Sequence, residues 1–210
     1  MVRVKYRIRF RKGSQLRLIS HHDLMRCFER MLRRADLPFR TTEGFNPRPK
    51  MAFALSLGLG IEGCAEVVEM ELFEELSADE LLERLRRQAP LGLELDSCRQ
   101  IEPRAAAQVR QMTYRVPLPN GDNDELRARA GALMTEEHCW IERSRPRPRR
   151  LDVRPALCRL DVQADALEMD VAVVQEGTPR PDEIMALLGL TGLLEQGAVL
   201  QRTKLELSDE

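Results

Sequence analysis

The 210-residue chain has few aromatic residues, only three histidines and no long apolar segment. Aromatics make up 4% of the residues, which argues against a broad aromatic platform for stacking nucleic-acid bases. The longest apolar run, from Met51 to Ile61, is interrupted by glycines and a serine and falls short of the roughly 18 residues that a spanning helix needs. The first residues alternate in polarity and contain no signal-peptide apolar stretch. We therefore expect a cytoplasmic protein without membrane contact.

Motifs for metal, disulfide or common catalytic chemistry are also missing. The five cysteines are odd in number and dispersed, at Cys27, Cys64, Cys98, Cys139 and Cys158, with no CxxC pair and no CxxxCxxC run. We expect no disulfide framework, no metal site and no iron–sulfur cluster in this chain, and we interpret the cysteines as reduced core residues. The sequence has no P-loop, GxGxxG, HExxH or GxSxG motif, so nothing in it independently indicates an enzyme.

Positive charge is clustered, although the net charge is only −1. Residues 1–50 carry 14 Lys and Arg against 4 Asp and Glu, and residues 143–150 contain five arginines without an acid. Residues 51–100 and 151–210 are acidic, with 4 basic against 11 acidic and 5 basic against 12 acidic residues. Two separated basic segments in a nearly neutral chain favour a polyanionic partner.

Hydrophobic periodicity predicts the same order of elements twice. Alternating residues from Val2 to Phe10 predict a strand with one buried face, and Ser20 caps a helix whose apolar positions continue to Ala35. A further strand over residues 51–57, another strand, a helix and a last strand complete a β-α-β-β-α-β order. We expect an α+β fold of two tandem ferredoxin-like halves with antiparallel sheets, residues 1–102 and 108–207, the second with an extra hairpin around residues 143–150.

The basic residues of the first strand allow two interpretations. Lys5, Arg7 and their alternate neighbours could offer a basic sheet face to a nucleic-acid backbone. In a ferredoxin-like half, however, this strand is central, and its neighbours carry acids. We favour ion pairing of these cations with Glu69, Glu71, Glu94 and Asp96.

The following helix carries a row of cations opposite its apolar face. His22, Arg26, Arg30 and Arg33 recur at helical spacing, with Arg34 beside them, and only Asp23 and Glu29 lie near enough to pair with Arg26 and Arg33. The row is either a solvated face or a contact surface for a nucleic-acid backbone. Because the helix and the open sheet face lie on opposite sides of the predicted half, one flat ligand cannot touch both, and we choose the helix.

Two adjacent histidines begin this helix. His21 and His22 lie where free backbone N–H groups favour an anion, so His21 could contact phosphate or act as a general acid or base. Local packing and a hydrogen bond to Asp23 are the structural alternative. His138 is the only other histidine, and the sequence does not place it.

Two loops complete the candidate surface. In the segment 41–50, Gly44, Phe45, Asn46 and Pro47 are expected to form a stiff structural loop that holds Arg48 and Lys50 for a ligand, unless the loop is a simple crossover.

The tract 143–150 is either an exposed hairpin tip or an arm for RNA backbone contact through Arg147 and Arg149.

Ordered motifs along most of the chain resemble a known family. These motifs are RIRFRKG at Arg7–Gly13, Ser20-His21-His22-Asp23, Leu37-Pro38, GFNPRPK at Gly44–Lys50 and, later, Asp152-Val153-Arg154-Pro155. They are similar to those of the radical-SAM-linked protein family, a bacterial domain family of uncharacterised function. Its members are encoded beside a cobalamin-binding-type radical SAM protein or fused to its C-terminal end.

The resemblance implies association with radical SAM chemistry on a partner. The iron–sulfur cluster and S-adenosylmethionine would lie on the radical SAM protein, because this chain lacks the cysteine triad. We expect an RNA-binding accessory domain that presents a structured RNA to that enzyme. The alternatives are an enzyme that acts on RNA with His21 as acid or base, and a protein-only adaptor whose basic patch docks on the partner.

Overall fold

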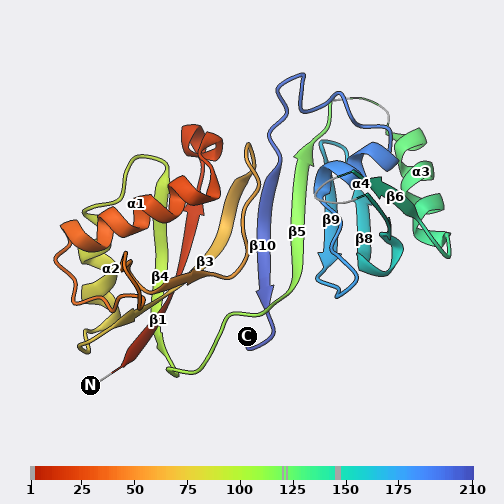
Figure 1. Cartoon of the computed structure of the whole chain (residues 1–210). Helices are drawn as coiled ribbons and strands as arrows, with labels where there is room; N and C mark the ends of the chain where they lie inside the picture. The colour runs from red at the N-terminus through yellow and green to blue at the C-terminus, as the bar shows by residue number, and fades with distance from the viewer. Residues whose placement is uncertain (1–2, 120, 122, 145–147) are drawn as a thin grey trace. The chain divides into compact units, whose positions relative to one another are not determined.

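The computed structural model describes residues 3–119, 121, 123–144 and 148–210 (Figure 1). The chain divides into two compact units, Met1–Gln108 with Leu207–Glu210, and Val109–Glu206. The described part of the chain contains four α-helices, and its strands pair mostly in antiparallel fashion, so the fold class is α+β. The last four residues thus return to the N-terminal unit.

The N-terminal unit follows the predicted order of elements. Its elements are β1 (Val4–Lys12), a 3-10 helix (Ser14–Leu18), α1 (His21–Arg34), β2 (Met51–Phe53), β3 (Glu62–Leu72), α2 (Ala78–Arg86) and β4 (Leu93–Ile101). The strands are arranged β4-β1-β3, with β2 on β3, and all three pairings are antiparallel. Strand β1 is therefore central, as predicted.

Strand β2 is shorter than the predicted strand over residues 51–57. The backbone N–H of Ala54 still donates to the Val67 carbonyl at 3.0 Å, and beyond it the chain leaves the sheet. A turn follows in which the Ile61 N–H donates to the Gly58 carbonyl and Gly60 adopts a φ of 82°. The apolar pattern continues into this turn, which is why periodicity alone overestimates the strand.

Helix α1 is capped at both ends by local chemistry. The Ser20 hydroxyl accepts a hydrogen bond from the Asp23 backbone N–H at 3.1 Å, which satisfies one free donor of the first turn. At the other end, Asp36 has a φ of 48° and Pro38 follows, so the helix cannot continue. The cap predicted from the sequence is confirmed.

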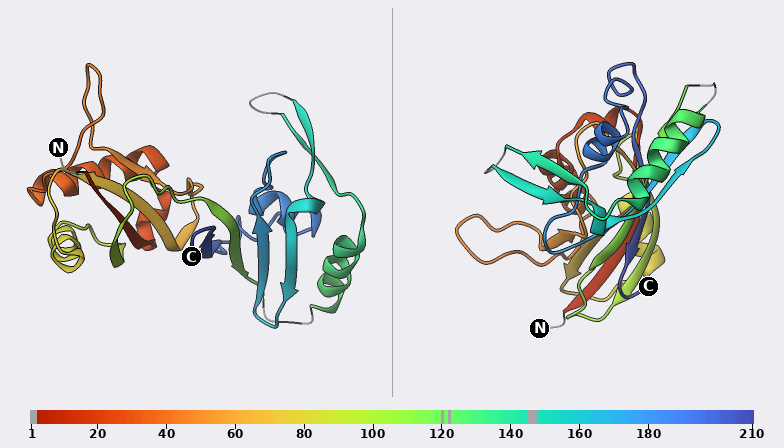
Figure 2. Two further views of the ribbon diagram at one scale, coloured as in Figure 1. Left: turned by 90° about the horizontal axis from the view of Figure 1, so that it is seen from below. Right: turned by 90° about the vertical axis from the view of Figure 1, so that its right-hand side faces the viewer.

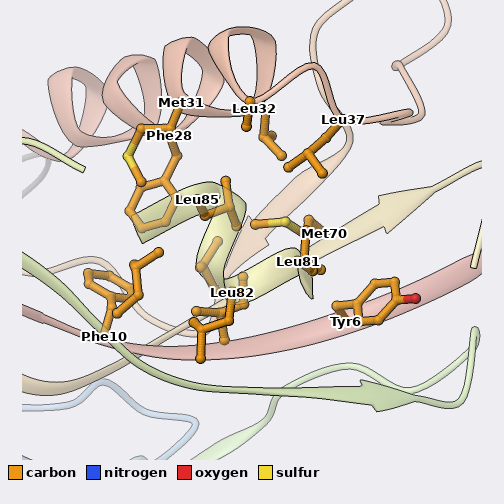
Figure 3. Close-up of a cluster of buried hydrophobic side chains, with 14 of the residues drawn as sticks. Tyr6, Phe10, Phe28, Met31, Leu32, Leu37, Met70, Leu81, Leu82 and Leu85 are labelled. Atoms are coloured by element: carbon orange, nitrogen blue, oxygen red, sulfur yellow. The ribbon is translucent and has the colours of Figure 1, made fainter. Parts of the chain in front are cut away.

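The core of the N-terminal unit lies between one sheet face and both helices (Figure 3). Tyr6, Ile8 and Phe10 of β1 are fully buried, and they meet Phe28 of α1 and Leu81 of α2. The Phe10 and Phe28 rings pack edge to face with centroids 5.1 Å apart, an arrangement that aromatic pairs favour. The alternation predicted for the first strand places these residues correctly.

The C-terminal unit contains β5 (Val109–Pro117), α3 (Asp124–Thr135), β6 (Trp140–Arg143), β7 (Arg149–Asp152), a 3-10 helix (Arg154–Ala156), β8 (Leu157–Val162), β9 (Ala166–Ala172), α4 (Pro181–Leu187) and β10 (Gln201–Leu207). Its strand order is β10-β5-β9-β8. Strands β6 and β7 form a separate antiparallel hairpin, which projects from this unit in Figure 2. This is the extra hairpin that the sequence predicts.

Candidate nucleic-acid interface

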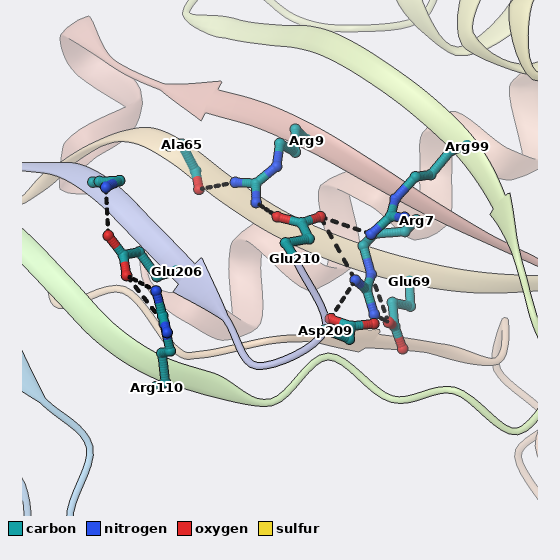
Figure 4. A network of polar contacts seen from close by, with 10 residues as sticks. Arg7, Arg9, Ala65, Glu69, Arg99, Arg110, Glu206, Asp209 and Glu210 are labelled. Carbon is teal, nitrogen blue, oxygen red and sulfur yellow. Dashed lines mark hydrogen bonds and ion pairs between the residues drawn. The ribbon is translucent and has the colours of Figure 1, made fainter.

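On the second face of β1, Lys5 and Arg7 are buried, and Arg7 and Arg9 are paired with carboxylates (Figure 4). The Arg7 side chain is 0% exposed and donates to Glu69 Oε1 from Nε at 3.0 Å and from Nη2 at 2.8 Å. Lys5 Nζ lies 2.7 Å from Glu69 Oε2. The expectation that only one face of this strand is buried is therefore wrong, because an ion-paired layer covers the second face.

The C-terminal tail supplies carboxylates that sequence patterning did not identify. Asp209 Oδ1 accepts from Arg7 at 2.9 Å, and this hydrogen bond holds the pKa of Asp209 below its usual value. Glu210 pairs with Arg9 and lies 2.8 Å from Arg99. Periodicity cannot predict such contacts, because they join residues between 111 and 202 positions apart in the sequence.

The predicted partners of the β1 cations are found in part. Glu69 pairs with Lys5 and Arg7, and Asp96 pairs with Arg11 at 3.1 Å. Glu94 lies opposite Arg11 in the sheet register, but no ion pair between them occurs in the described part of the chain. The pairing interpretation of this strand is thus supported over an open basic face.

Glu71 gathers three cations around a nearly buried carboxylate. Arg3 lies 2.7 Å from its Oε1, and Arg40 and Lys50 lie 3.4 and 3.5 Å from its Oε2. Lys50, a predicted ligand contact, is therefore also a structural counter-ion, although 45% of its side chain remains exposed.

The cation row of α1 is exposed. Arg26 makes one ion pair, with Asp23 at 3.3 Å, between side chains that are 63% and 52% exposed, a type worth about 0–1 kcal/mol. In the part of the chain that the structure describes, neither Arg30 nor Arg34 has a salt bridge. The row therefore keeps most of its positive charge for a ligand.

Arg33 connects this row with the base of the loop 41–50. Its guanidinium lies 5.3 Å from the centroid of the Phe39 ring, a cation–π contact, and it makes no ion pair with Glu29 within the described ranges. The loop projects from the unit in Figure 2, where it is coloured orange. Arg33 thus contacts the segment that leads into the loop.

The neck of the loop is held by backbone and side-chain hydrogen bonds. The Thr42 N–H donates to the Arg48 carbonyl at 2.8 Å, and the Arg48 N–H donates to the Thr42 hydroxyl at 3.1 Å. Gly44 has a φ of 127°, which a residue with a Cβ rarely adopts, and the side chains of Phe45 and Arg48 are exposed. Asn46 and Pro47 are also exposed.

The His21 side chain belongs to an aromatic cluster. Its ring lies 5.1 Å from that of Phe53 in an edge-to-face arrangement, and Phe53 in turn contacts Phe10 and Phe28. His22 is exposed one position further along. This geometry supports the packing alternative for His21.

The hairpin β6–β7 divides its arginines between two roles. Arg143 donates to both oxygens of Glu183 at 2.6 Å, so it is a structural anchor. Arg149 is exposed with its guanidinium against Gly177, and Arg147 lies outside the described residues. Arg150 lies 4.4 Å from the Trp140 ring centroid, a contact that sequence analysis missed. The diagonal cross-strand position of these two residues could have indicated it, once the hairpin register was known.

Metal and redox features are sparse. Among the described residues, no three His, Cys, Asp or Glu side chains gather in a way that could hold a metal ion. Cys27 and Cys139 are buried and Cys64 and Cys98 half-buried, whereas Cys158 is exposed, so its interpretation as a core residue is wrong. Within the described ranges, no helix is long and apolar enough to cross a membrane.

Comparison with known proteins identifies the family of this chain. No curated protein matches the chain. A solved structure described as an unknown protein from Galdieria sulphuraria is similar over 98% of this chain and 99% of its own, at 12% identity and a TM-score of 0.32, which is too low to carry an argument. The family model described as an uncharacterized protein conserved in bacteria, DUF2344, matches residues 5–181. The chain therefore belongs to the DUF2344 family of uncharacterised bacterial proteins.

Proposed function

We propose that this protein is an RNA-binding module that presents a structured RNA to a partner radical SAM enzyme. The observation that carries the RNA part is the contrast between the two basic elements of the N-terminal unit. The cations of β1 form ion pairs with Glu69, Asp96 and the C-terminal tail. The cations of α1 face solvent and form few ion pairs within the described part of the chain. Like charges at helical spacing are mildly unfavourable for the helix, and an anion bound along the row would offset that cost.

The proposed contact surface consists of Arg26, Arg30 and Arg33 on α1 with Arg48 and Lys50 of the loop. Exposure of these side chains, and the contact of Arg33 with Phe39 at the base of the loop, support one surface. Arg149 belongs to the other unit and is proposed as a further backbone contact, together with Arg147. His21 is proposed only as a neighbouring group, because its packing on Phe53 gives little support to acid–base catalysis.

Salt dependence of RNA binding tests the surface. About six phosphate contacts to a single strand predict a slope of log K against log salt near about −4, at roughly −0.7 per contact. Arg30→Gln and Arg48→Gln should each make the slope shallower by about 0.7. Arg11→Gln, an exposed β1 arginine paired with Asp96, is the matched control and should leave the slope unchanged.

A slope near zero for every RNA tried would reject the RNA module and favour the protein-only adaptor. The partner is tested by crosslinking in cells, followed by sequencing of attached RNA and identification of attached proteins. Recovery of a radical SAM protein supports the partnership, and its absence among reproducibly attached proteins counts against it. The cluster and S-adenosylmethionine are proposed to reside on that partner, and the protein is proposed to act in the cytoplasm.

We also infer that the two units are tandem ferredoxin-like halves. The inference is supported by the strand orders β4-β1-β3-β2 and β10-β5-β9-β8. When β6–β7 is treated as an insertion and the other strands are numbered along each unit, both sheets place the fourth strand beside the first, then the third and then the second. Each unit also contributes two helices to the described chain. A repeated fold would allow each unit to carry its own basic arm.

A further inference from the structure

A cleft lies between α1 and the segment that follows α2. Its volume is about 560 Å³, within the range of about 300–1,000 Å³ that small-molecule sites occupy. Its apolar lining comes from Leu16, Ile19, Met31, Ala89 and Pro90. All of these residues belong to the N-terminal unit, so the cleft is a property of that unit alone.

Two guanidinium groups at this cleft lack an acidic partner. Arg30 and Arg34 both line it, one helical turn apart, and no salt bridge to either occurs in the described part of the chain. Like charges at this spacing cost a helix a few tenths of a kcal/mol. The repulsion between them is relieved if an anion binds between the two side chains.

The other charged groups of the cleft are already engaged. Asp23 accepts a hydrogen bond from the Ser20 hydroxyl at 2.7 Å and pairs with Arg26. Arg87 pairs with Glu83 at 3.1 Å. Asp23, the only acid among the described residues that line the cleft, is therefore engaged with Ser20 and Arg26 rather than with Arg30 or Arg34.

Both guanidinium groups lie near Cys27, which interacts with Arg30 through a side-chain hydrogen bond and with Arg34 through its charge. Burial raises the pKa of the Cys27 thiol, and the nearby charges of Arg30 and Arg34 act in the opposite direction. Cys27 itself lines the cleft, although only 8% of the residue is exposed. A ligand held by the two arginines would therefore cover this thiol.

We propose that this cleft binds one nucleotide, with its phosphate between Arg30 and Arg34 and its base on the apolar floor. Guanidinium groups match phosphate geometry with paired hydrogen bonds, and a flat base covers aliphatic surface that phosphate alone would leave wet. The Gln88 amide, also in the lining, offers a donor and an acceptor to a base edge.

The inference rests on the proposed function where the nucleotide is an unpaired residue of RNA, since a duplex would keep its bases stacked inside. A free mononucleotide has the same chemistry and is the second source. The two sources differ in whether RNA binds at all.

Protection of Cys27 from alkylation tests the cleft directly. The full chain is treated with N-ethylmaleimide alone or with uridine or adenosine monophosphate, an RNA hairpin with an unpaired loop, a blunt RNA duplex or inorganic phosphate. Peptide mapping then gives the rate at each cysteine. We expect saturating mononucleotide or hairpin to slow modification of Cys27 at least about fivefold, and the exposed Cys158 of the other unit to be unaffected.

Variants separate the charge from the floor. Arg34→Gln should raise the concentration for half-protection by about tenfold or more, as expected for loss of a charge-assisted hydrogen bond. Arg104→Gln, which removes another exposed arginine of the same unit, should leave it unchanged. Ala89→Leu fills part of the floor without changing charge and should also weaken protection. Because Arg34 is exposed, its variant tests the proposal even if the floor variant misfolds.

The outcomes distinguish this inference from the RNA proposal. If neither mononucleotides nor the hairpin protect Cys27 while RNA binds with the expected salt slope, the cleft proposal is overturned and the RNA module stands. If mononucleotides protect Cys27 but no RNA binds, the cleft is supported and the RNA module is overturned. Protection by inorganic phosphate or by the blunt duplex as strong as that by the hairpin overturns the role of the base.

Discussion

Replacing Arg7 by methionine should destabilise the N-terminal unit without affecting RNA contact. The substitution removes a side chain that is 0% exposed and that makes three hydrogen bonds to carboxylates, two to Glu69 and one to Asp209. Breaking one side of a buried ion pair typically costs 3–5 kcal/mol, because the remaining charge stays buried. Lys5 still lies 2.7 Å from Glu69, so we expect the lower end, about 3 kcal/mol.

Urea unfolding followed by far-ultraviolet circular dichroism measures this loss. Hydrogen exchange of the β1 and β3 amides assigns it to the N-terminal unit, which fluorescence cannot do because the single tryptophan, Trp140, lies in the other unit. Arg11→Met is the matched control, since its ion pair is exposed and should cost at most about 1 kcal/mol. A cost for Arg7→Met within 1 kcal/mol of wild type, or equal to that of Arg11→Met, would refute the pairing argument.

The contact between Arg7 and the tail carboxylate of Asp209 should make the unfolding free energy depend on pH. The hydrogen bond from Arg7 lowers the pKa of Asp209, so ionised Asp209 stabilises the fold at pH values above the ordinary carboxyl pKa of about 4. This contribution is lost as the pH falls through the lowered pKa of the folded state. The difference in unfolding free energy between wild type and Asp209→Asn should therefore shrink below about pH 4, and it should be clearly smaller at neutral pH in an Arg7→Met background, where only the weaker interactions with Arg99 and the backbone remain.

Three further predictions concern local chemistry. Ser20→Ala removes the α1 cap and should lower the unfolding free energy in urea by about 1 kcal/mol, whereas no loss would contradict the capping geometry. Asp152→Ala leaves two backbone N–H donors unpaired and should cost the C-terminal unit about 2 kcal/mol at neutral pH. Burial favours the neutral form of Asp152, but hydrogen bonds from those N–H groups and from His138 lower its pKa overall, so this difference should fade only in strong acid. Burial raises the pKa of Cys98 to about 12, so exposed Cys158 should react with a thiol reagent at pH 8 well before Cys98, and the reverse order would contradict the assigned burial.

Local patterning was sufficient for most elements of the fold. The alternation from Val4 to Phe10 and the Ser20 cap predict a strand and a helix that the structure contains, because both depend on neighbours within a few residues. The limit of this reasoning shows at residues 51–57, where apolar residues continue through a turn and the strand ends early. Leu57, beyond the strand, is buried whereas Leu59 in the turn is exposed, so the apolar pattern by itself does not show where the strand ends.

The sequence also predicts only part of the candidate site. The spacing of Arg26, Arg30 and Arg33 places them on one helix face from sequence alone, since 3.6 residues per turn fixes that geometry. Their distance from acids elsewhere in the chain was not predictable, and neither was the position of the cleft beside Arg34. Both depend on how α1 packs against a segment more than 50 residues away.

The sequence by itself determined where positive charge is concentrated, and the tertiary structure decided which of that charge is available. Arg7 and Arg30 have the same side chain in equally basic segments. Arg7 is neutralised by Glu69 on a neighbouring strand and by Asp209 at the far end of the chain, whereas no carboxylate reaches Arg30 in the described part of the chain. Coulomb interactions act over distances in space that the order of residues does not contain, so only the folded chain separates a structural arginine from one free to bind.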